Sequence, residues 1–174
     1  MHQPSPTILT VSRNLLTGLI VINLVFAVAA AVIIVGSFGA ESFLLEQLTR
    51  EHGAEGSAAY LRVLRLALAV GLLSVPIGHL LLTRLRAMVD TVRSGDPFVA
   101  VNARRLTVIA WCLLAIQLLD LLFGAVALSV AGQDSPLSGW SFNITGWIAV
   151  LLLFVLARVF EQGAAMREDI EGTV

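Results

Sequence analysis

The stretch NLLTGLIVINLVFAVAAAVIIVGSFGA, residues 14–40, contains no charged side chain. An α-helix needs about 20 consecutive, mostly apolar residues to cross the hydrocarbon core of a bilayer, which is roughly 30 Å thick. Backbone amides in lipid must be paired within a helix or a closed barrel, and an unbroken apolar run favours the helix over the alternating pattern of a barrel strand. This stretch therefore predicts a transmembrane helix.

Three more stretches meet the same length requirement. They run from about Leu61 to Thr83, from Leu106 to Gly132 with Asp120 as the one charged interruption, and from Ser135 to Ala157. Apolar residues make up 57% of the chain and charged residues 13%, which excludes an ordinary soluble domain. We predict a single domain over residues 1–174, an all-α polytopic membrane protein with four transmembrane helices at about 14–38, 61–83, 106–131 and 141–160.

The first span has a second interpretation. Arg13, the apolar core after it and Ala27-Val28-Ala29 resemble a secretory signal peptide with its cleavage site. Against cleavage, the apolar run continues to Phe38, so that a cleaved chain would begin with an apolar stub.

The arginines divide unequally between the two sides of the predicted spans. Eight lie on the side that holds both chain ends and the connection between spans two and three, and three lie on the other side. In multispan proteins the side richer in basic residues is cytoplasmic. We therefore expect both termini in the cytoplasm, together with a cytoplasmic hairpin formed by residues 84–105.

The tip of this hairpin has the residues of a tight helix–helix turn. Gly95 suits the left-handed position that ends a helix, Asp96 suits an N-cap, and Pro97 suits the first helical position. On this interpretation helix two runs from about residue 61 to 94 and helix three from 97 to about 131, and both extend past the membrane.

Phe98, at the same tip, leaves two alternatives open. Its ring either folds back onto Val92 and Val101 or contacts a partner. The glycine, aspartate and proline before it are also open to a purely structural interpretation, in which they only make the turn.

The connection between the first two spans, from Glu41 to Tyr60, is long enough to have a surface of its own. Its apolar residues recur at helical spacing, and Glu46 stands four positions before Arg50, where the two charges can pair. We expect a short amphipathic helix that ends at Gly53.

The residues around the hairpin tip and at the C-terminal end resemble a known family. Ser94-Gly95-Asp96-Pro97-Phe98 is followed by Asn102-Ala103-Arg104-Arg105-Leu106, and Phe160-Glu161-Gln162-Gly163 is followed by the segment from Met166 to Val174. Together these motifs are similar to those of the domain of unknown function 2975 family, small bacterial proteins with four membrane helices. The resemblance covers nearly the whole chain in span order. It implies a protein of the bacterial cytoplasmic (inner) membrane that controls or tethers a small helix-turn-helix transcription regulator.

Both motifs fall on the predicted cytoplasmic side, where residues 161–174 are expected to continue span four as a helix. We therefore predict a partner-binding surface there, made by Arg93, Asp96, Pro97, Phe98, Asn102, Arg105, Arg167 and Asp169. The alternative for the arginines is that they hold anionic lipid headgroups.

Four polar side chains lie within the predicted spans: Asn23, His79, Gln117 and Asp120. An ionisable group at membrane depth is costly and is by default a hypothesis of function. For Asp120 two interpretations stay open, a hydrogen bond that packs helices, or a proton or ligand site. The second would make the protein a small transporter or a proton-linked sensor, which is the alternative to the regulatory function.

Enzymatic motifs are not found in the sequence. The three histidines fall in different compartments, and the chain has no nucleotide-binding loop, zinc-ligand spacing or nucleophile elbow. We predict no catalytic activity, no metal or other cofactor and no direct nucleic-acid binding, while a homo-oligomer is compatible with the sequence.

Overall fold

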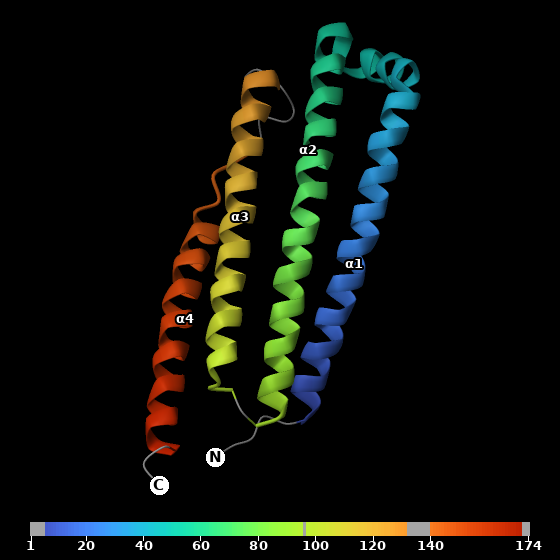
Figure 1. Cartoon of the computed structure of the whole chain (residues 1–174). Coiled ribbons are helices and arrows are strands. Elements are labelled where there is room, and N and C mark those ends of the chain that lie inside the picture. Colours follow the sequence, from blue (N-terminus) through green and yellow to red (C-terminus); the bar gives the residue numbers. More distant parts are fainter. Residues whose placement is uncertain (1–5, 96, 132–139, 172–174) are drawn as a thin grey trace. The chain divides into compact units, whose positions relative to one another are not determined.

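A computed structural model of the chain describes residues 6–95, 97–131 and 140–171. It contains four helices: α1 (Pro6–Gly39), α2 (Glu41–Arg93), α3 (Ala100–Ala131) and α4 (Ile144–Glu171) (Figure 1). Helix α2 is interrupted at Gly53, which adopts φ 74° and ψ 166°, so that the described residues form five helical segments. The predicted all-α class is confirmed.

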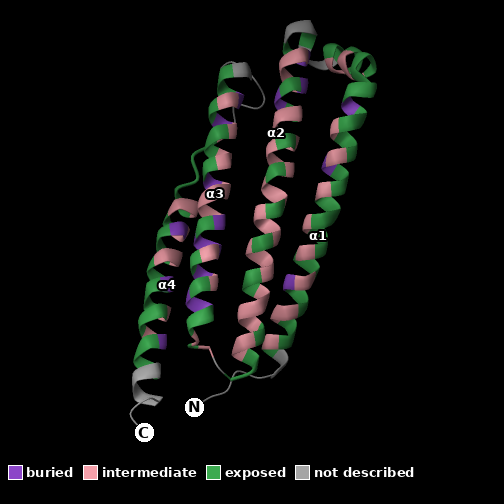
Figure 2. Ribbon diagram, in the orientation of Figure 1, coloured by how far each residue is buried: buried purple, intermediate pink, exposed green. Residues whose placement is uncertain are grey.

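The four long helical segments are apolar enough to cross a membrane. They cover Ile8–Gly39, Gly56–Arg93, Ala100–Ser129 and Ile144–Arg167. Large apolar side chains also point outward along them, as in Val28 on α1, Val35 on α1 and Leu151 on α4, each about two-thirds exposed or more. Figure 2 shows this exposed surface along α1 and α4. The four predicted membrane spans are therefore confirmed as apolar helices, which is the composition of a multi-pass membrane protein.

The predicted short helix between spans one and two is also confirmed. It begins at Glu41 and is interrupted at Gly53, as expected. Gly53 has a positive φ there, which would be strained for any residue with a Cβ. Its predicted charge pair is formed, with Arg50 Nη2 2.8 Å from Glu46 Oε1.

The chain folds into two compact units. Unit 1 comprises Met1–Asn23, Ile77–Ala115 and Ile144–Val174, and unit 2 comprises Leu24–Pro76 and Ile116–Asn143. Within unit 1, the beginning of α1, the connection from α2 to α3 and the end of α4 lie at the same end (Figure 1).

The core of unit 1 lies along α3. Its buried residues there are Asn102, Ala103, Leu106, Ile109, Ala110 and Cys112. Trp111 packs edge-on against Phe154 of α4, with ring centroids 5.3 Å apart. At the beginning of α1, Arg13 Nε lies 3.4 Å from Asp90 Oδ1 of α2. Unit 1 thus joins parts of all four helices.

Unit 2 is held at one end by Arg65 of α2. Its guanidinium donates to the Ser37 hydroxyl at 3.0 Å and to the Ser37 carbonyl at 2.5 Å, and it pairs with Glu41 at 3.2 Å. It also lies 4.0 Å from the centroid of the Phe38 ring. These contacts satisfy a helix-terminal carbonyl of α1 and fasten the turn into the short helix.

A second contact within unit 2 brings the chain before α4 onto α3. The Trp140 indole covers Gly124 so closely that a Cβ added at Gly124 would lie 2.2 Å from Trp140 Cε2. Gln117 Nε2 donates to the Asn143 carbonyl at 3.4 Å. Only a residue without a side chain fits under the indole at position 124.

Candidate partner-binding surface

The connection between α2 and α3 is organised by Asn102, which is fully buried at 0% exposure. Its Nδ2 donates to the Pro97 carbonyl at 2.9 Å. Its Oδ1 accepts from the Thr91 hydroxyl at 3.0 Å and from Arg105 Nη1 at 2.9 Å. The amide thereby joins the end of α2, the connecting segment and the first turn of α3, with its donor and its acceptor both used.

Arg105 points inward to the same cluster. Its Nη1 lies 2.9 Å from the Ala87 carbonyl and 3.0 Å from Thr91 Oγ1, in addition to its contact with Asn102. A guanidinium that donates to three acceptors of its own chain is a structural group. Both residues therefore shape the connection from inside, and a direct contact of either with a partner stays a prediction.

The end of α2 follows the sequence prediction. Gly95 has φ 86°, and its N–H donates to the Val92 carbonyl at 3.1 Å, while the Ser94 N–H donates to Asp90 at 3.2 Å. Glycine reaches this left-handed conformation without strain. The predicted positive φ of Gly95 is confirmed.

The predicted start of α3 at Pro97 is wrong, because residues 97–99 are not helical and α3 begins at Ala100. In a helix beginning at 97, the Pro97 carbonyl would accept from the backbone four residues later. Here it accepts from the Asn102 side chain instead, and the Asn102 N–H donates to the Val99 carbonyl at 2.8 Å. Asp96, the predicted N-cap, lies outside the described residues.

Phe98 packs on α4, which neither of the two sequence alternatives included. Its ring centroid lies 5.2 Å from that of Phe160, and a Cβ added at Gly163 would lie 3.3 Å from its Cδ1. Even so, 47% of Phe98 remains exposed. The ring is thus held in place on one side and open on the other.

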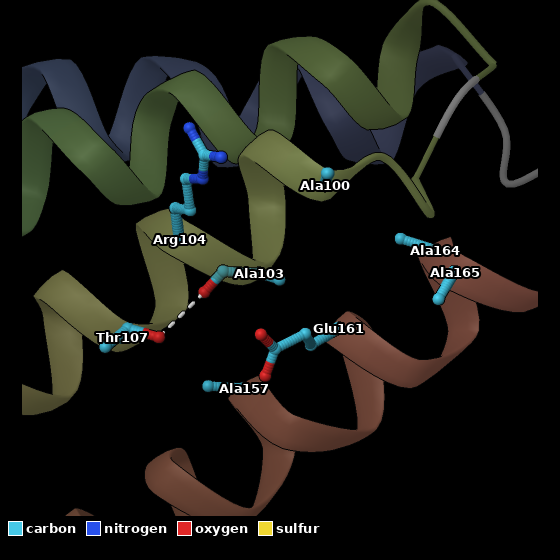
Figure 3. A pocket seen from close by; sticks show the side chains of 8 residues that line it. All are labelled: Ala100, Ala103, Arg104, Thr107, Ala157, Glu161, Ala164 and Ala165. Carbon is cyan, nitrogen blue, oxygen red and sulfur yellow. Dashed lines mark hydrogen bonds between the residues drawn. The ribbon is translucent and has the colours of Figure 1, made fainter. Parts of the chain in front are cut away.

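A pocket of about 240 Å³ lies beside this aromatic contact, between the first turns of α3 and the second half of α4. It is lined by Ala100, Ala103, Arg104, Thr107, Ala157, Glu161, Ala164 and Ala165 (Figure 3). Alanines on both facing helices leave the space open. The Glu161 carboxylate lies on the side of α4 that faces α3, whereas the Arg104 guanidinium points away from α4 (Figure 3).

The remaining predicted partner-binding residues lie at the same end of unit 1. Arg93 is exposed at the last turn of α2, and Arg167 is exposed on α4. The side chain of Asp169, also on α4, lies outside the described part of the chain. We define the tip surface as Arg93, Phe98, Arg104 and Glu161, which are exposed in unit 1.

The four intramembrane polar residues are divided between the two units. Asn23 and His79 belong to unit 1, and Gln117 and Asp120 to unit 2. Asn23 Oδ1 and His79 Nδ1 are buried and make no hydrogen bond to the described residues. Gln117 is buried and donates to the Asn143 carbonyl, while Asp120 is half-buried. The transporter or sensor alternative for Asp120 stays a prediction.

Sequence reasoning missed three parts of this surface: the Phe98–Phe160 contact, the buried position of Asn102 and the alanine pocket. A signal for the first was present, since Phe160 and Gly163 stand three positions apart and thus on one helix face. That face needs an apolar partner, and Phe98 is the ring that packs on it.

A comparison with family models matches residues 46–174 to a protein of unknown function family, DUF2975. The chain belongs to the DUF2975 family. The match includes the whole tip surface and both motifs on which the resemblance was recognised. No match was found among curated proteins or among solved structures.

Proposed function

We propose that this DUF2975 protein tethers or regulates a soluble cytoplasmic partner, which it binds through the tip surface. The observation that carries the proposal is the arrangement of Phe98. The ring packs against Phe160 and Gly163, yet about half of it is exposed, and Asn102 braces the connection that carries it with three hydrogen bonds. A preorganised aromatic needs little further ordering on binding, and aromatic residues are enriched among the side chains that dominate interfaces.

The charges around Phe98 fit the rim of such an interface. Arg93 and Arg104 are exposed, and Glu161 is 62% exposed in its pair with Arg158. Charged groups at a rim steer association and make it dependent on salt, while the apolar centre contributes affinity that depends little on salt. The arginine distribution supports a cytoplasmic position for this end, and the family resemblance supports a bacterial inner membrane.

The class of partner follows from the family resemblance, which implies a small helix-turn-helix transcription regulator. The protein would then hold a DNA-binding partner at the membrane or release it. Neither catalysis nor direct contact with nucleic acid is needed for this function.

The test is co-purification of such a regulator with the protein from native membranes at two salt concentrations. Phe98→Ala should weaken association about tenfold or more at both, since truncating a central aromatic costs about 1–2 kcal/mol or more. Arg93→Glu should weaken association and steepen its loss with salt. Phe43→Ala is the matched control, because Phe43 is an exposed aromatic in unit 2. Capture that is equal in all four proteins would exclude the tip surface as the binding site.

A further inference from the structure

Two charged residues line the pocket between α3 and α4: Glu161, and Arg104, whose guanidinium points away from α4 (Figure 3). The Glu161 carboxylate lines the pocket on the side of α4 that faces α3 (Figure 3). The Thr107 hydroxyl already donates to the Ala103 carbonyl at 3.1 Å, so its oxygen has lone pairs left to accept with. Both polar groups therefore favour a ligand that donates hydrogen bonds and carries positive charge.

The walls of the pocket are apolar and narrow. Ala103, Ala157 and Ala164 are buried and form its floor, and the space of about 240 Å³ suits one slender side chain. The stems of lysine and arginine pack along apolar surface while their charged heads reach a polar group. The dimensions and the charge thus match the same kind of side chain.

The carboxylate can exchange its present partner. Arg158 Nη1 lies 2.7 Å from Glu161 Oε2, but the two side chains are 79% and 62% exposed. Exposed ion pairs one helical turn apart contribute little, so that an incoming cation meets little competition.

We propose that the pocket accepts a lysine or arginine side chain of the soluble partner, with its stem on the alanines and its charge on Glu161. This inference rests on the proposed function, because it names the group of the partner that enters beside Phe98. The pocket is continuous with the tip surface: Gly163, which Phe98 covers, directly precedes the lining residues Ala164 and Ala165. That continuity favours a protein side chain over a lipid ammonium.

The first experiment needs no partner. Protein with ¹³C-methyl alanine in phosphatidylcholine nanodiscs is titrated with N-acetyl-lysine amide, and with N-acetyl-norleucine amide, which has the same stem without the ammonium. We expect saturable shifts of the Ala103, Ala157 and Ala164 methyl signals with the lysine probe alone. Glu161→Gln should weaken that binding about fivefold, the effect of removing one exposed charge pair. Glu46→Gln, in an equally exposed pair of unit 2, should leave it unchanged.

The proposal would be overturned by no shift with lysine, by equal shifts with norleucine, or by unchanged lysine binding in Glu161→Gln. Loss of lysine binding when the nanodiscs contain phosphatidylethanolamine would also overturn it, and would assign the pocket to the ammonium of a lipid. Ala165→Leu supplies a second variant at an exposed lining position, where added bulk should block the probe without disturbing the core.

Failure of this inference is distinguishable from failure of the proposed function. If the partner co-purifies and depends on Phe98 but not on Glu161, the proposed function stands and the pocket does not take part in binding. If no partner is captured while the lysine probe binds in a Glu161-dependent way, the pocket binds cations and the tethering function is wrong.

Discussion

Replacing Asn102 with alanine should loosen the α2–α3 connection without unfolding the protein. The substitution removes three hydrogen bonds at 2.9, 3.0 and 2.9 Å from a fully buried amide. At about 1 kcal/mol net for each bond, the free energy of opening the connection falls by about 3 kcal/mol. The opening equilibrium then becomes about 100-fold more favourable. The Pro97 carbonyl and the Arg105 guanidinium would each lose a partner.

Hydrogen exchange measured by mass spectrometry in nanodiscs is the appropriate assay, because amides there report local opening directly. Exchange in a peptide covering residues 91–102 should accelerate by about two orders of magnitude, while a peptide from the middle of α4 should be unaffected. Thr107→Val is the control on the same helix, since it removes a single hydrogen bond to the Ala103 carbonyl from an exposed hydroxyl. Acceleration of less than threefold in Asn102→Ala would refute the role assigned to this amide.

Two further predictions concern packing and topology. Gly124→Ala should displace the Trp140 indole and, like other overpacking substitutions, lower the free energy of unfolding by about 1–3 kcal/mol in a denaturant titration. In a variant with Trp111 and Trp147 replaced by phenylalanine, the fluorescence of Trp140 should also shift. Gly18→Ala, where an added Cβ meets nothing within 4 Å, should be neutral or slightly stabilising, and equal effects at the two glycines would contradict the packing. In a Cys112→Ala background, a cysteine at Ser94 should react only with membrane-permeant reagents and one at Glu46 with impermeant reagents outside. The opposite pattern would reverse the orientation inferred from the arginines.

The sequence was sufficient to predict the elements that depend on local chemistry. Apolar runs defined the four long helices, and the positive φ at Gly53 and Gly95 follows from glycine being the residue that tolerates it. These features need no knowledge of which helix packs on which. The prediction of where α3 starts failed because a side chain five positions later decides it. Asn102 Nδ2 donates to the Pro97 carbonyl, which a helix starting at Pro97 would use for a backbone hydrogen bond.

Contacts between helices were harder to predict, because lipid-facing and core-facing positions of a membrane helix are both apolar. On α1, Val28 is 66% exposed while Ala30, two positions on, is 1% exposed, although both are simply apolar residues in the sequence. A periodic signal does exist. The buried residues Leu16, Ala30 and Ser37 are spaced by multiples of seven, the spacing of a narrow helix–helix seam, and two of the three are small. Residue size at that spacing carries the information that hydropathy lacks.

The neighbouring residues Arg104 and Arg105 show why charge alone could not define the candidate surface. Both count equally toward the cytoplasmic orientation, yet Arg105 is held by three acceptors inside unit 1 and Arg104 is exposed. Reversing the charge of Arg105 would place a carboxylate beside the Ala87 carbonyl and Asn102 Oδ1, both acceptors, and would disrupt the connection that positions Phe98. A loss of partner binding in such a variant would therefore say nothing about direct contact. Charge reversal at Arg93 or Arg104 changes the rim while leaving the Asn102 cluster intact, so these two positions separate recognition by a partner from the rigidity of the tip.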